Sequence, residues 1–158
     1  MKNHSILSLT LSAIIVDTII GYYLLLSNRG GRYIKEWYNQ FNIGAYVMDI
    51  LSIIVGTYSA TLFSNNIYSQ IVATVIVGLI HDISFGIFVN KVQTESKILT
   101  LFKNYANELG SNILIVDAFM LISTLLFSVY FKSAWTNSAM IFLSVIVSYI
   151  GLLMIYSF

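Results

Sequence analysis

The chain of 158 residues is 58% hydrophobic and only 9% charged, whereas soluble domains carry about 25% charged residues. This composition excludes an ordinary water-soluble fold. The formal net charge is +1, so no strong positive field is available to hold nucleic acid. Cysteine is absent, which excludes disulfides, thiolate metal sites and thiol catalysis.

Five apolar stretches have the length of membrane-spanning helices, each with about 19 to 23 residues. In lipid the backbone polar groups can be hydrogen-bonded only within a helix or a closed barrel. The alternating segments that are typical of a barrel are not found in the sequence. The first stretch runs past twenty residues without a small-x-small cleavage site, which favours a span over a signal peptide. We therefore expect an all-α integral membrane bundle, a single transmembrane domain over residues 1–158, with spans at residues 6–26, 43–63, 67–89, 113–131 and 139–158.

Two segments between the spans, residues 33–41 and 92–109, have bulky side chains at helical spacing with charged residues between them. This pattern predicts two short amphipathic helices in the headgroup layer. Their apolar stripes face either lipid or the end of the bundle, and both arrangements leave a polar face for a partner. The candidate partner contacts are Arg32, Tyr33, Trp37, Tyr38, Phe41, Phe102, Lys103, Tyr105 and Glu108.

The cations indicate an orientation in the membrane. Six of the eight lie in or near the two amphipathic segments, and only Lys2 and Lys132 lie on the opposite side. Under the positive-inside rule the amphipathic segments face the cytoplasm, which places the N-terminus outside and the C-terminus inside. The six are Arg29, Arg32, Lys35, Lys91, Lys97 and Lys103.

Acidic residues divide by type between spans and loops. The glutamates, Glu36, Glu95 and Glu108, lie in loops, whereas each of the first four spans carries one aspartate: Asp17, Asp49, Asp82 and Asp117. An aspartate at a helix centre costs about 2.5 to 3.5 kcal/mol on insertion scales. We therefore expect these carboxyl groups to face the interior of the bundle and one another.

Helix geometry places three of these aspartates at one depth. Asp49, Asp82 and Asp117 lie six or seven residues from the cytoplasmic ends of their spans, which is roughly 10 Å at about 1.5 Å per residue. His81 is the titratable nitrogen at the same depth. Adjacent side chains point about 100° apart on a helix, so we expect either His81 or Asp82 to contact a neighbouring helix or a loop. Together with Asp17, these residues form a predicted polar layer.

Three interpretations of this layer are open. An inter-helix hydrogen-bond network would fix the register of the helices. A proton or cation pathway would use the carboxyl groups in a hydrated cavity. A metal site would combine His81 with carboxylates, but no paired-histidine or Glu-x-x-His spacing supports it.

No motif of catalysis is found: the chain lacks a Gly-rich phosphate loop, a nucleophile elbow and a zinc-protease helix. We expect no enzyme activity, no catalytic residue, no metal and no cofactor. Serine and threonine residues inside the spans are expected to bond their own helix backbone.

Three stretches carry a resemblance. They are Trp37-Tyr38-Asn39-Gln40-Phe41 leading to Asp49, Ile80-His81-Asp82-Ile83-Ser84-Phe85, and Phe102 to Gly110 with Asp117-Ala118-Phe119-Met120. Over residues 37–125 the chain resembles an uncharacterised conserved multi-pass membrane protein of large double-stranded DNA viruses of algae and protists. The resemblance implies a component of the virion inner membrane beneath a capsid shell, and it transfers no biochemical role to any residue.

The function expected first is therefore structural: a viral membrane protein, anchored by its bundle, that contacts minor capsid proteins or other viral membrane proteins through its cytoplasm-side helices. Its membrane is the virion internal membrane or a host membrane. The alternative is a proton or cation channel or transporter that uses the aspartate layer. Lipid is an expected partner, nucleic acid is not, and a homo-oligomer is left open.

Overall fold

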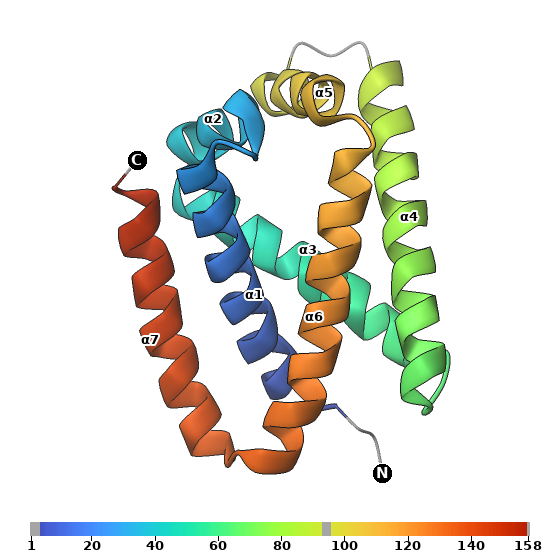
Figure 1. The fold of residues 1–158 in the computed structure, drawn as a ribbon. Helices are drawn as coiled ribbons and strands as arrows, with labels where there is room; N and C mark the ends of the chain where they lie inside the picture. Colours follow the sequence, from blue (N-terminus) through green and yellow to red (C-terminus); the bar gives the residue numbers. More distant parts are fainter. Residues whose placement is uncertain (1–3, 93–95, 158) are drawn as a thin grey trace.

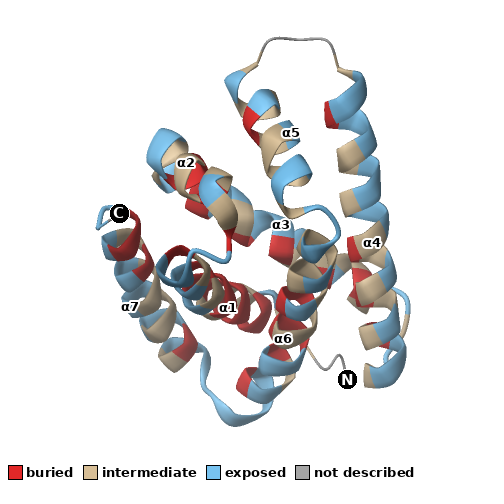
Figure 2. Cartoon of the chain, turned by 45° about the horizontal axis from the view of Figure 1, so that its top comes forward, coloured by how far each residue is buried: buried red, intermediate tan, exposed pale blue. Residues whose placement is uncertain are grey.

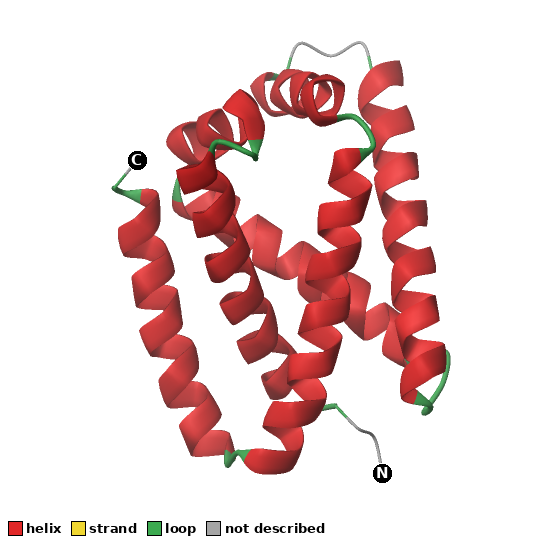
Figure 3. Ribbon diagram, viewed as in Figure 1, coloured by secondary structure: helices red, strands yellow, loops and turns green. Residues whose placement is uncertain are grey.

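The computed structural model describes residues 4–92 and 96–157, in which every regular element is a helix (Figure 3). Lys2, Glu95 and the last residue of the fifth predicted span, Phe158, lie outside the described residues. The helices are α1 (Ile6–Ser27), α2 (Gly31–Phe41), α3 (Ile43–Thr61), α4 (Ile67–Lys91), α5 (Lys97–Leu109), α6 (Asn112–Ala134) and α7 (Asn137–Ile155).

Five of these helices, α1, α3, α4, α6 and α7, are long and apolar enough to cross a membrane. The predicted fold class, a helical membrane bundle with two additional short amphipathic helices, is confirmed. The predicted ends of the spans differ from the observed ends by up to three residues. The fifth span, for example, ends at Ile155.

The prediction of a helix over residues 92–109 is wrong at its start. Val92 follows the last residue of α4 with ψ at 123°, its backbone N–H bonds the Phe88 carbonyl, and α5 begins only at Lys97. Val92 is apolar and fits the periodicity of both helices, so the pattern could not assign it. The other amphipathic helix, α2, begins at Gly31, two residues before its predicted start.

α1 is the central helix of the bundle. It packs against α6, α7 and α3. In its apolar segment 56% of the residues are buried, whereas in the corresponding segments of the other four spans between 11% and 28% of the residues are buried. Figure 2 shows this as the nearly continuous buried surface along α1. Its first turn is closed by a capping box, in which the Ser5 hydroxyl accepts from the Ser8 backbone N–H and Ser8 accepts in return.

α2 and α5 lie side by side across one end of the bundle, the end where the C-terminus lies, while the N-terminus is at the other end (Figure 1). Each turns sharply into the span that follows it. The turn after α2 is made by Asn42, with φ 47° and ψ −123°, and the turn after α5 by Gly110, with φ 54° and ψ −131°. Left-handed φ values of this kind suit Gly and Asn better than bulky residues.

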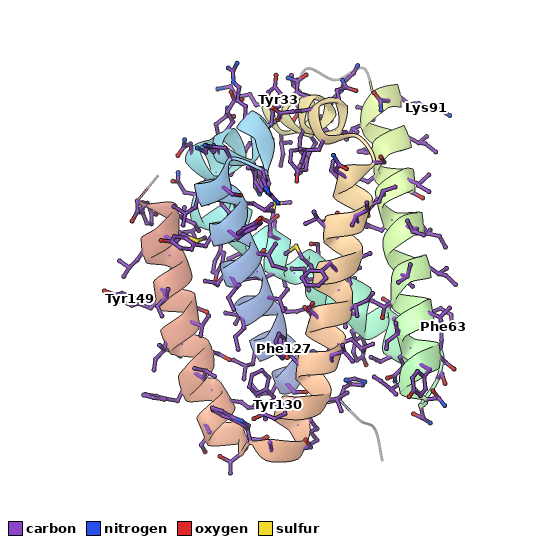
Figure 4. The ribbon with its side chains drawn as sticks, viewed as in Figure 1. Tyr33, Phe63, Lys91, Phe127, Tyr130 and Tyr149 are labelled. Carbon is purple, nitrogen blue, oxygen red and sulfur yellow. The ribbon has the colours of Figure 1, made fainter. Side chains whose placement is uncertain are left out.

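Large apolar side chains cover the outer faces of the spans. On α7, Phe142, Val145 and Tyr149 are each at least 63% exposed, and Figure 4 shows Tyr149 pointing away from the bundle. Such a surface suits contact with acyl chains. The protein is thus a membrane protein by its fold.

Candidate functional site

A cavity of about 520 Å³ lies between the spans at the end of the bundle covered by α2 and α5. Residues from α1 to α6 line it, and they include every member of the predicted polar layer: Asp17, Asp49, His81, Asp82 and Asp117. Among the described residues no lysine or arginine lines it. Four acidic groups from four helices therefore share one mostly apolar cavity, and no lysine or arginine of residues 4–92 and 96–157 pairs with them there.

Asp49 is held from the amphipathic helix above it. Its Oδ2 accepts a hydrogen bond of 2.8 Å from the Tyr38 hydroxyl, and its two oxygens accept from Trp37 Nε1 at 3.2 and 3.1 Å. Trp37 and Tyr38 are each 4% exposed. α2 thus reaches into the bundle and fixes the orientation of this carboxyl group.

Asp17 is the most deeply buried of the four aspartates, at 2% exposure. Its Oδ2 has no hydrogen-bond partner within the described part of the chain, although the side chain lines the cavity. An unpartnered carboxyl oxygen away from water is costly. A proton, a water molecule or a cation in the cavity would satisfy it.

Asp82 points inward, with a side chain 15% exposed, whereas the neighbouring His81 side chain is 64% exposed at the cavity edge. Nδ1 of His81 lies 3.0 Å from Asp82 Oδ1, and the imidazole stacks on Phe85 of the same helix. The sequence predicts that one of the two side chains contacts another helix or a loop, and among the described residues no hydrogen bond or ring contact of His81 does so. Its hydrogen-bond and ring partners, Asp82 and Phe85, are both on α4.

Asp117 faces the same cavity from α6, where it interacts electrostatically with Asp82 and Asp49. Tyr105 of α5 lies above them. Burial raises the pKa of the Tyr105 phenol above its ordinary value of 10.0, and the negative charges of Asp117 and Asp49 raise it further. The pKa of Tyr38 of α2 is raised in the same way, first by burial and then by the negative charges of Asp17 and Asp49. Two tyrosines thus cover the acidic cavity.

The structure corrects the role expected for several candidate partner contacts. Trp37 and Tyr38 are buried within the chain, and Phe41, Phe102 and Tyr105 pack against the same core. The ring of Trp37 lies 4.9 Å from that of Phe41 and 4.8 Å from that of Phe102. Of the two alternatives for the apolar stripes, packing onto the bundle is the one observed. The pattern could not decide this, because periodicity does not show what an apolar face contacts.

Of the remaining candidate contacts, Arg32, Lys103 and Glu108 lie on the exposed side of the α2–α5 layer, whereas Tyr33 is half-buried and lines the cavity. Arg32 and Lys103 are exposed. Glu108 joins the two helices: Oε1 accepts from the Arg32 backbone N–H at 2.9 Å and Oε2 from the Tyr33 N–H at 3.2 Å. These N–H groups belong to the first turn of α2, so a side chain of α5 caps that helix.

The four aspartates line one cavity without converging on a point. Among the described residues no two of them share a hydrogen bond, and no group of three or more histidine or acidic side chains is close enough to hold a metal ion. The inter-helix bonds of the layer run from Asp49 to α2 instead of between the aspartates. The arrangement suits exchange of protons or monovalent ions with water better than tight coordination of a divalent metal.

The fold and the cavity define a small helical-bundle membrane protein with an acidic interior. Comparison with family models, with curated proteins and with solved structures finds no match.

Proposed function

We propose that this protein is a non-enzymatic membrane protein that conducts protons or monovalent cations through its acidic cavity. The single observation that supports this most is Asp17: it is buried at 2% exposure, it lines the cavity, and one of its oxygens has no partner in the described part of the chain. A carboxyl group kept in this state at membrane depth is typical of an ion or proton pathway.

The charge of the cavity supports the same proposal. Four carboxyl groups with no lysine or arginine among the lining residues favour a positively charged occupant. The α2–α5 end, where the cavity lies, also carries most of the cations: Arg29, Arg32, Lys35, Lys91, Lys97 and Lys103. Figure 4 shows Lys91 at this end, opposite Tyr130. Under the positive-inside rule we place this end in the cytoplasm, with the N-terminus outside.

Proton flux into liposomes tests the proposal. The purified protein is reconstituted with a pH-sensitive dye inside, and a potassium diffusion potential drives proton entry. We expect flux above that of empty liposomes and at least a tenfold decrease in Asp117→Asn, because this substitution removes a titratable group that makes no hydrogen bond to α2. Glu36→Gln is the matched control, since Glu36 lies on α2 outside the cavity and pairs with Arg32.

A second measurement, with a potassium-sensitive dye in place of the pH-sensitive dye and with a potassium gradient but no pH gradient, separates potassium flux from proton flux. Zero flux in the natural protein and in every variant, for both ions, would exclude the conductor. Equal loss of flux in Asp117→Asn and Glu36→Gln would show that the cavity is not the pathway.

A second candidate is the structural role: a component of a viral membrane that contacts minor capsid proteins. It rests on the resemblance over residues 37–125 and on the exposed cations Arg32 and Lys103 of the α2–α5 layer. A tagged chain would then copurify with membrane-containing capsids, and Lys103→Glu would weaken this. Copurification that is unchanged by Lys103→Glu and Arg32→Glu would show that the layer is not the contact.

A further inference from the structure

Three threonines lie inside the bundle without hydrogen bonds. Thr57 of α3, Thr74 of α4 and Thr124 of α6 are 0% exposed, and their hydroxyl oxygens have no partner within the described residues. Threonines in membrane helices ordinarily bond a carbonyl of the preceding turn. These three do not, so the expectation for hydroxyls within the spans is wrong here and their polarity requires another explanation.

Each of the three threonines lies about two helical turns from the aspartate of its own helix, toward the N-terminal end of the bundle. Thr57 follows Asp49 by eight residues, Thr124 follows Asp117 by seven, and α4, which runs the other way, places Thr74 eight residues before Asp82. Each interval is about 11 to 12 Å along its helix. The three helices pack against one another pairwise, so the hydroxyls form a second polar layer toward the N-terminal end.

A third polar level follows one helical turn further on. Gln70 precedes Thr74 by four residues and Ser128 follows Thr124 by four, and both are buried. His4 joins them: its Nδ1 lies 2.6 Å from the Ser128 hydroxyl and its Nε2 lies 2.8 Å from Oε1 of the Gln70 side chain. Polar groups thus extend from the acidic cavity to the opposite end of the bundle.

An apolar side chain lies between the cavity and the threonine of α6. Leu121 of α6 lies between Asp117 and Thr124, lines the cavity and is 6% exposed. It occupies a notch formed by two glycines: a Cβ added at Gly78 would lie 2.8 Å from Leu121 Cδ1, and one at Gly56 would lie 3.2 Å from Cδ2. An apolar constriction of this kind closes a pathway by excluding water.

We propose that Thr57, Thr74 and Thr124 form a water-binding site on a route between the acidic cavity and the His4 cluster, and that Leu121 is the gate that closes this route. A hydroxyl both donates and accepts a hydrogen bond, as a chain of water molecules that carries protons requires. The inference rests on the proposed function for its purpose, but the access of water to the threonine layer is measurable without any flux.

The absence of cysteine from the chain makes that access directly testable, because an introduced cysteine is then the only thiol. Thr124→Cys reports on the threonine layer, Ser52→Cys on the cavity, and Leu125→Cys on a buried neighbour at 0% exposure. Each is made alone and together with Leu121→Ala. A membrane-impermeant, positively charged methanethiosulfonate reagent is added from the α2–α5 side of proteoliposomes.

We expect Ser52→Cys to react in both backgrounds and Leu125→Cys in neither. Thr124→Cys should react at least tenfold faster when Leu121 is alanine. Equal reactivity of Thr124→Cys in the two backgrounds overturns the gate, and no reaction even with Leu121→Ala overturns the route. Leu121→Val, a smaller change that leaves a branched side chain in the notch, should give an intermediate rate and serves if the alanine variant does not fold.

The two proposals fail separately. If labelling follows the expected pattern but no variant conducts, the conductor is excluded and the water route stands. If the natural protein conducts but labelling does not depend on Leu121, the conductor stands and the gate is excluded.

Discussion

The hydroxyl of Tyr38 donates a hydrogen bond of 2.8 Å to Oδ2 of Asp49, which ties the amphipathic helix α2 to the span α3. Both groups lie in a largely apolar environment, where the loss of the Tyr38 hydroxyl leaves the Asp49 carboxyl group with only the Trp37 indole N–H as a donor. The bond therefore stabilises the position of α2 over the cavity as well as the orientation of the carboxyl group.

Tyr38→Phe should lower the free energy of unfolding in detergent by about 1 to 2 kcal/mol, because it removes this bond and keeps the ring. Tyr149→Phe is the control, since Tyr149 is 63% exposed on the outer face of α7. Tryptophan fluorescence during denaturation measures both variants, and Trp37, which bonds the same carboxyl group, reports on the site directly. Equal stabilities of the two variants would contradict the structural role of the bond.

Stability should fall at high pH. The pKa values of Tyr38 and Tyr105 are raised above the ordinary value of 10.0, first by burial and then by nearby carboxylates. The folded state then keeps its protons where the unfolded chain loses them, so stability is constant below about pH 10 and decreases above it, by up to about 1.4 kcal/mol per pH unit for each group.

Tyr105→Phe should make this decrease shallower, whereas Tyr149→Phe should not. Denaturation series at several pH values between 8 and 12, with tyrosinate absorbance near 295 nm as the second measurement, check both. Tyrosinate from Tyr105 that forms in the folded protein near pH 10 would disagree with its burial among carboxylates.

Glu108→Ala should destabilise the contact between α2 and α5 by about 1 kcal/mol, the usual loss for a helix N-cap, because Glu108 accepts from two N–H groups in the first turn of α2. Glu36→Ala removes only the exposed pair with Arg32 and should leave stability nearly unchanged. Limited proteolysis near Arg29 and Arg32 compares the two. Similar cleavage rates would show that the cap is dispensable.

Two glycines of α4 form a matched pair. A Cβ at Gly78 would lie 2.8 Å from Leu121, whereas one at Gly86 meets nothing within 4 Å. Gly78→Ala should therefore lower stability by about 1 to 3 kcal/mol through overpacking, and Gly86→Ala should be neutral or stabilise by up to about 1 kcal/mol through helix propensity. Thermal unfolding in detergent measures the difference, and the reverse order would refute the fit of Leu121 in its notch.

The spans could be predicted because apolar length alone selects them. Their boundaries could not be placed to the residue, since these depend on local backbone geometry such as the extended conformation at Val92. The shared position of Asp49, Asp82 and Asp117 followed from depth arithmetic, because helices of opposite direction begin and end at the same interface.

The partners of the aspartates were not predicted. The sequence pattern places Trp37 and Tyr38 in an amphipathic segment, and such a segment predicts a surface for a partner. The chemistry of the two side chains offered a signal. An indole N–H and a phenol on an otherwise apolar stripe need hydrogen-bond acceptors when they are buried. The aspartates of the spans are acceptors that the sequence leaves without an obvious partner. The threonine layer carried no such signal, because threonine in a helix ordinarily bonds its own backbone.

The central position of α1 constrains how the protein is made. α1 precedes α6 and α7 in the chain and is synthesised before them, yet it packs most extensively against these two helices. Until α6 arrives, the buried polar side chains Ser8, Ser12 and Asp17 face lipid, the insertion machinery or a chaperone. The order of synthesis and the order of packing are therefore opposed, and an unfinished chain should be a substrate for membrane quality control.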